Sequence, residues 1–485
     1  MYNRITIEIA ISKKTFKLDE LFKEEKLYRF SCYLLFLIIC LNSVFNIIQK
    51  NRVEILSNIN FFDLTTGILL FIFLYLIGSL VKEVLQFDSV SLGVTSYLFS
   101  FFITDSLILF FYQKLTFSKI LILVNLLWLT FFIFKLKNFK SILQIFLSLA
   151  LLRLYFDFFI SNLTINNNIR GDVEAIFFNQ AKNIYEGSYF NSINNYIFEG
   201  YPQFLSYIQS IFLGLSTSIS EYNFYSFTSH IVFYLSILFF VELKISKFHK
   251  FFLIALFSLL LLNSSFLTFL FTTSLMSEGL VSLFTAITVV SVLNNLSSGG
   301  NLDYKLFLIL GLMYFSKQFN SSLVLLLVIL LYFISGKNKA VLFGFSGIAL
   351  KELLFLFVFT GTEISKDHHI RQIDIADTIL DLLLFRDLEV ENIFLILKNF
   401  WIDKPIVILF FIFYFSYIYS KIFIKKFELQ SDLIFLLINL NIIFVFLLYI
   451  SVWQNMELES PIRYFLSNLH LLMLSIFLKI DKTKK

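Results

Sequence analysis

The segment RGDVEAIFFNQAKNIYEGSYF, residues 170–190, is polar and lies between long apolar runs on both sides. Within it, apolar residues recur at the i, i+3, i+4, i+8 spacing of one helix face. Asp172 stands where a helix N-cap belongs, and Gly187 stands where a left-handed C-cap belongs. The pattern predicts a short helix along a membrane surface, with Asp172 at its start and Glu174 in its first turn.

The composition around this segment is that of a membrane protein. Of the 485 residues, 58% are hydrophobic and 15% are charged, whereas a soluble domain is about half apolar and a quarter charged. The net charge of +5 does not indicate a nucleic-acid partner, because the basic residues are spread between the apolar runs. Cys32 and Cys40 both fall in the first apolar run, so they form neither a disulfide framework nor a metal site.

The apolar runs predict an all-α fold, a polytopic transmembrane helical bundle of about 14 spans with the surface helix in an external catalytic loop. The predicted spans are 30–48, 64–81, 92–112, 120–134, 141–160, 223–241, 251–271, 280–293, 306–315, 323–334, 341–359, 406–419, 433–450 and 464–478. Lysines collect in loops that place both termini in the cytoplasm, and we expect the inner (cell) membrane of a bacterium. A full crossing by the short apolar segment 204–216 would put the lysines of 243–250 outside, so we expect that segment to dip into the outer leaflet.

Three regions follow from this topology. Residues 1–140 hold a cytoplasmic segment and four leading spans, and residues 141–360 hold a catalytic module with the external loop 161–222. Residues 361–485 hold a second external loop with an amphipathic helix, followed by the last spans. The external side therefore carries most of the residues that are able to do chemistry.

Carboxylates and cations meet on that external side. Asp172, Glu174 and Glu278 are candidate catalytic residues, because a carboxylate within hydrogen-bond reach can act as general base on an acceptor hydroxyl. Lys317 and Arg463 are candidate binders of a donor phosphate, because cations neutralise charge on a leaving phosphate. No metal-ligand spacing of His and Cys is present in the sequence, and no metal ligands are assigned.

The order of these motifs resembles that of the GT-C integral-membrane glycosyltransferases, which include the protein O-mannosyltransferases and the lipid A aminoarabinose transferase. The motifs are Gly171-Asp172-x-Glu174, Tyr185-x-Gly187, Tyr201-Pro202, Ser277-Glu278, Ser316-Lys317 and Pro461-Ile462-Arg463-Tyr464. In that family the acidic loop follows the first span, whereas here it follows the fifth. A second proline is common after the first, where this chain has Gln203.

The resemblance implies a polyprenyl-phosphate-linked sugar donor, an inverting transfer and Asp172 as the base. The acceptor would be a glycan, lipid or protein of the cell envelope, and membrane lipids would surround the enzyme. Tyr201, Pro202 and Tyr464 would position the substrates. No cofactor is assigned, and Glu278 would orient the acceptor, or a divalent metal if the reaction uses one.

Two other functions fit the same sequence. An O-antigen-type polymerase or ligase would use arginines of the 361–404 loop, where Arg371 and Arg386 are available. Arg371 is also a candidate binder of the donor phosphate, together with Lys317 and Arg463. A transporter or lipid flippase would use ionisable residues within spans, such as Arg153 and Asp157.

Overall fold

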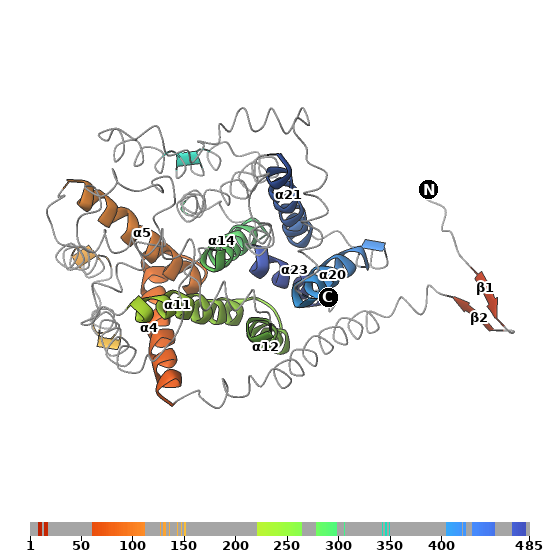
Figure 1. Ribbon diagram of the computed structural model, residues 1–485, viewed down its shortest axis with the longest axis horizontal. Coiled ribbons are helices and arrows are strands. Elements are labelled where there is room, and N and C mark those ends of the chain that lie inside the picture. Colours follow the sequence, from red (N-terminus) through yellow and green to blue (C-terminus); the bar gives the residue numbers. More distant parts are fainter. Residues whose placement is uncertain are drawn as a thin grey trace.

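The computed structural model describes the chain in separate stretches (Figure 1). They are 8–11, 14–17, 61–111, 221–263, 278–297, 404–419, 421–422, 429–451 and 468–481, with the single positions 127, 130, 131, 135, 143, 147, 150, 151, 305, 342, 345, 346 and 349. The predicted spans 30–48, 120–134, 141–160, 306–315, 323–334 and 341–359 lie wholly or mostly outside these residues.

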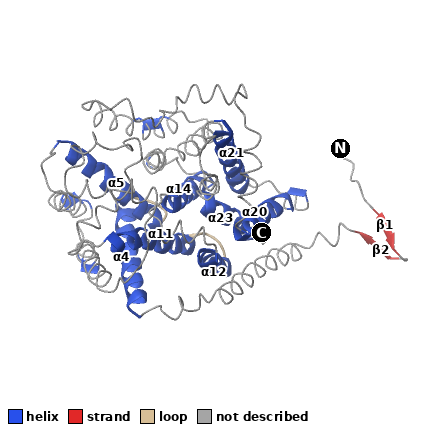
Figure 2. Cartoon of the chain, viewed as in Figure 1, coloured by secondary structure: helices blue, strands red, loops and turns tan. Residues whose placement is uncertain are grey.

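Helices dominate the described stretches (Figure 2). They are α4 (Phe61–Leu85), α5 (Val90–Phe111), α11 (Glu221–Glu242), α12 (Lys247–Asn263), α14 (Glu278–Ser297), α20 (Lys404–Tyr419), α21 (Leu429–Ser451) and α23 (Leu469–Asp481). A short hairpin that the sequence did not predict pairs β1 (Glu8–Ile11) with β2 (Lys14–Lys17) in antiparallel register. The predicted helical class is therefore confirmed for the bundle as far as it is described, and the number of spans stays a prediction.

The helices α14 and α23 lie at the centre of the described bundle (Figure 1). α14 contacts α5, α11 and α23, while α23 also contacts α12, α20 and α21. On the other side, α11 packs against α4, α5 and α12. Helices from all three predicted regions of the sequence therefore share one core, and α4 and α5, which come from the first of these regions, belong to it.

The α4–α5 connection is a tight turn with defined caps. Gln86 has a φ of 58°, and the N–H of Phe87 donates to the carbonyl of Lys82 at 3.0 Å. This is the Schellman arrangement that ends a helix. The hydroxyl of Ser89 then accepts the N–H of Leu92 at 3.2 Å, which caps the first turn of α5.

The same two helices cross at a pair of glycines. A Cβ added to Gly93 would lie 2.2 Å from the carbonyl oxygen of Gly78, and a Cβ added to Gly78 would lie 2.5 Å from the carbonyl oxygen of Val90. Both distances are well below an ordinary van der Waals contact, so a larger residue would force the helices apart. Direct backbone contact thus sets the geometry of this pair.

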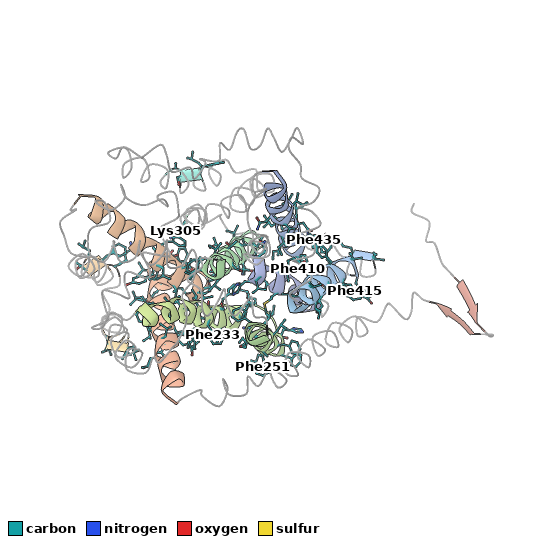
Figure 3. The ribbon with its side chains drawn as sticks, viewed as in Figure 1. Phe233, Phe251, Lys305, Phe410, Phe415 and Phe435 are labelled. Carbon is teal, nitrogen blue, oxygen red and sulfur yellow. The ribbon has the colours of Figure 1, made fainter. Side chains whose placement is uncertain are left out.

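Side chains of α20, together with Lys421 just beyond its end, contact α21, and Figure 3 labels Phe410, Phe415 and Phe435 in this region. The pairs are Tyr414–Asn439 (hydrogen bond, 2.7 Å), Tyr417–Phe435 (stacked rings, 3.4 Å between centroids) and Lys421–Asp432 (ion pair, 2.6 Å). As the residue number rises from 414 to 421 on the first side, the number of the partner falls from 439 to 432. The two helices are therefore antiparallel in a fixed register.

One described stretch, Ile68–Leu85 in α4, is both long and apolar enough to cross a bilayer, with a mean hydropathy of 2.2. The other apolar helical stretches found among the described residues are shorter. They are Val90–Ser100, Ile231–Glu242, Gly279–Asn294, Val407–Tyr419 and Ser431–Ile443.

Candidate functional site

One predicted site residue falls in the described stretches: Glu278 is the first residue of α14. The other eight lie outside them, namely Asp172, Glu174, Tyr201, Pro202, Lys317, Arg371, Arg463 and Tyr464. The start of α14 is therefore the place where the predicted site and the described structure meet.

A buried polar cluster lies one helical turn beyond Glu278. The hydroxyl oxygen of Ser282 is 2.9 Å from Nδ1 of His470, and it also accepts the backbone N–H of His470 at 3.2 Å. On the other side of the ring, Nε2 of His470 is 2.9 Å from the hydroxyl oxygen of Ser236. None of these three side chains has exposed surface. The cluster thus joins α11, α14 and α23 in the core.

The hydrogen-bond network assigns the protons of this cluster. Ser236 donates its single hydroxyl proton to the carbonyl of Val232 at 2.5 Å, so it must accept from Nε2 of His470. A neutral imidazole with its proton on Nε2 then accepts from Ser282 at Nδ1. Every donor finds an acceptor, so the neutral form of His470 completes the network.

Aromatic rings enclose the imidazole. The ring of Phe240 stacks on His470 with centroids 5.8 Å apart, and the ring of Phe257 lies 5.2 Å away. An apolar surrounding strengthens the hydrogen bonds inside it and makes an unmatched polar group costly. Because His470 is fully enclosed, it fixes the helices around it and does not itself face a substrate in this structure.

The cluster brings two helix beginnings together. Ser282 is four residues after the first residue of α14, and His470 is one residue after the first residue of α23. The two helices therefore start at the same level of the bundle. Ser236 lies in the second half of α11, so this level is well inside the length of that helix.

A second polar cluster lies at the end of α11. The carboxylate of Glu242 accepts hydrogen bonds from the backbone N–H groups of Val90 and Ser91 at 2.5 and 2.8 Å. These N–H groups have no partner within the first turn of α5, and the negative charge complements the positive end of the helix dipole. Lys305 donates to the carbonyl of Leu85 at the end of α4, at 2.8 Å (Figure 3). Three segments that are distant in sequence thus meet around the α4–α5 turn, and we call this group the turn cluster.

Sequence reasoning did not single out His470 or Glu242. The signal for His470 was available, because it is an ionisable group inside the apolar run 464–478. Glu242 directly follows the apolar run 223–241, and an acidic residue at the end of an apolar run gives no signal of a specific role. Within the described stretches, no group of three or more His, Cys, Asp and Glu side chains is placed to hold a metal ion.

Comparisons with protein-family models, with curated proteins and with solved structures gave no match to this chain. The functional argument therefore depends on the residues and contacts described above.

Proposed function

We propose that the protein is a polytopic membrane glycosyltransferase of the GT-C type that uses a polyprenyl-phosphate-linked sugar. Asp172 takes the proton from an acceptor hydroxyl, whose oxygen attacks the anomeric carbon from the face opposite the phosphate. The bond between that carbon and the phosphate oxygen breaks, and the lipid phosphate leaves with the bonding electrons. Lys317 and Arg463 neutralise its charge, and Glu278 orients the acceptor.

A membrane setting is supported by the two faces of α4. Leu70 and Leu74 are buried against the bundle, while Ile68, Ile72 and Tyr75 are exposed on the outer face. A surface helix of a soluble protein has a polar outer face, whereas a helix that is apolar all round faces either a core or lipid. An exposed apolar face on a helix of this length favours lipid.

The observation that carries the proposed site is the pairing of Ser282 with His470. It brings the start of α14, which carries Glu278, beside the start of α23. Arg463 precedes Asn468, the first described residue before α23, by five residues. Even a fully extended chain of that length spans at most about 18 Å, which bounds the distance between the backbones of Arg463 and Asn468. A carboxylate and a phosphate-binding cation on the same side of the bundle are what the proposed reaction requires.

The turn cluster supports the orientation of that site. If α4, α5 and α11 cross the membrane, the contact of Glu242 with Ser91 requires an even number of crossings between them. The predicted topology has four, and a fifth crossing at 204–216 would make the number odd. The contact of Lys305 with Leu85 likewise agrees with the two predicted crossings between residues 242 and 305. The external loop with Asp172 then lies on the side opposite the turn cluster.

The start of α14 lies below the start of α11 in the bundle. Glu278 lies one turn from Ser282, about 6 Å along the helix, and Ser282 lies beside the second half of α11. Glu278 is therefore recessed from the start of α11. A recessed position suits a donor whose lipid tail lies between helices.

The test uses purified protein in lipid with radiolabelled polyprenyl-phosphate sugars and an envelope acceptor extract. We expect label to move to the acceptor with wild type, and Asp172→Asn to lose at least about a hundredfold in rate because the base is gone. Glu186→Gln is the matched control, because Glu186 is a carboxylate of the same loop that is not among the candidate catalytic residues. Full activity in folded Asp172→Asn protein would overturn the assignment of the base.

Transport is the second candidate, and His470 is the observation that favours it. An ionisable side chain deep in an apolar bundle is a common feature of proton relays. Ser236 and Ser282 hydrogen-bond both ring nitrogens, however, so neither nitrogen is open to receive a proton from a relay in this conformation. Movement of a lipid-linked sugar across vesicles without a covalent product would favour transport over transfer.

A further inference from the structure

The turn between α11 and α12 and the start of α12 form an exposed surface of mixed character, which we call the basic-aromatic surface. It consists of Lys244, Lys247, Phe248 and Phe251, all exposed. Phe251 is 70% exposed and Phe248 is 57% exposed, and Figure 3 shows Phe251 at the edge of the described helices. Residues three apart share a helix face, so the two rings lie on one side of α12.

The positive charge of this surface has no acidic neighbour in the adjoining sequence. Residues 243–258 contain no Asp or Glu. The closest acidic residue in sequence, Glu242, has both carboxylate oxygens engaged by the N–H groups of Val90 and Ser91. Lys250 donates to the carbonyl of Val241 at the end of α11. Within the part of the chain that the structure describes, Lys244 and Lys247 are exposed and form no ion pair.

We propose that the basic-aromatic surface binds the headgroups of anionic phospholipids at the membrane face on which the turn cluster lies. Exposed aromatic rings are costly in water and favourable at the boundary between headgroups and acyl chains. Each lysine near an anionic surface adds an attraction that corresponds to about a fivefold gain in affinity. A bilayer matches both features at once, whereas an acidic peptide matches only the charge.

Native mass spectrometry of the intact protein in detergent tests the proposal by titration with dioleoylphosphatidylglycerol and dioleoylphosphatidylcholine. We expect wild type to prefer the anionic lipid, and Lys244→Gln/Lys247→Gln to bind it about 25-fold more weakly. Lys82→Gln is the matched control: it removes one positive charge beside the turn cluster, where Glu83 is adjacent, and it should retain wild-type affinity.

A Phe248→Ser/Phe251→Ser variant separates the two contributions. It should weaken both lipids by a similar factor and leave the preference for the anionic lipid intact. The proposal is overturned if wild type shows no preference between the lipids, if the double lysine variant keeps its affinity, or if Lys82→Gln loses as much. None of these measurements depends on the glycosyltransferase reaction, so the two proposals fail or hold separately.

Discussion

At the scale of single residues, His470 is the side chain with the most consequences for the bundle. Replacing it with Phe removes two side-chain hydrogen bonds and leaves the hydroxyl of Ser282 without its acceptor in the core. Hydrogen bonds between membrane helices contribute about 0.6–1.7 kcal/mol each, so we expect His470→Phe to cost about 1–3 kcal/mol. A lower Tm in detergent would be the readout.

A double-mutant cycle with Ser282→Ala isolates this contact. Ser282→Ala alone leaves both Nδ1 of His470 and the backbone N–H of residue 470 without Ser282, whereas the double variant leaves only the backbone N–H, so it should lose less than the sum of the single losses. Ser291→Ala is the matched control on the same helix, because its hydroxyl donates only to the carbonyl of Ile287. Strictly additive losses would show that His470 and Ser282 do not depend on each other.

At the scale of elements, the first turn of α5 depends on a carboxylate from α11. Glu242→Gln keeps the shape of the side chain and removes the charge that complements the helix dipole, at a cost of about 0.3–2 kcal/mol. Hydrogen exchange at the amides of Val90 and Ser91 should therefore become faster, by up to about 30-fold. Glu83→Gln removes an equal charge from an exposed position near the same turn. Unchanged exchange in Glu242→Gln would mean that the carboxylate does not cap α5 in solution.

Element positions were largely predictable and their contacts were not. The predicted spans 64–81, 280–293 and 406–419 fall inside α4, α14 and α20, because long apolar runs bounded by polar residues define a helix by composition alone. The predicted span 251–271 begins four residues after the start of α12 at Lys247. The lysines in the first turn of α12 interrupt the apolar pattern, so hydropathy alone does not mark this helix start.

The contacts depend on pairs that no local pattern reveals. His470 and Ser236 are 234 residues apart, and serine is common in apolar helices. The crossing of Gly78 and Gly93 is similar: each glycine is unremarkable alone, and only the pair explains the close approach. The predicted site residues outside the described stretches stay predictions, because no described contact includes them.

At the scale of the whole molecule, the turn cluster makes a prediction about sidedness. In a background with Cys32→Ser and Cys40→Ser, single cysteines at Asp88 and Lys244 should both be protected from an impermeant maleimide in intact cells. A cysteine at Asn166 should be labelled, because the external loop is predicted to lie on the other side. Labelling of Asp88 and Lys244 from opposite sides would contradict the contact between α5 and α11 in a membrane.

The cap on α5 also has a consequence for biosynthesis. Glu242 is synthesised 151 residues after Ser91, which at 5–20 residues per second is a delay of roughly 8–30 seconds. During that interval α4 and α5 have left the ribosome while the carboxylate that caps α5 does not yet exist. The glycine crossing needs nothing from later in the chain, so the hairpin can assemble first. We expect α11 to dock onto this hairpin once Glu242 has been made.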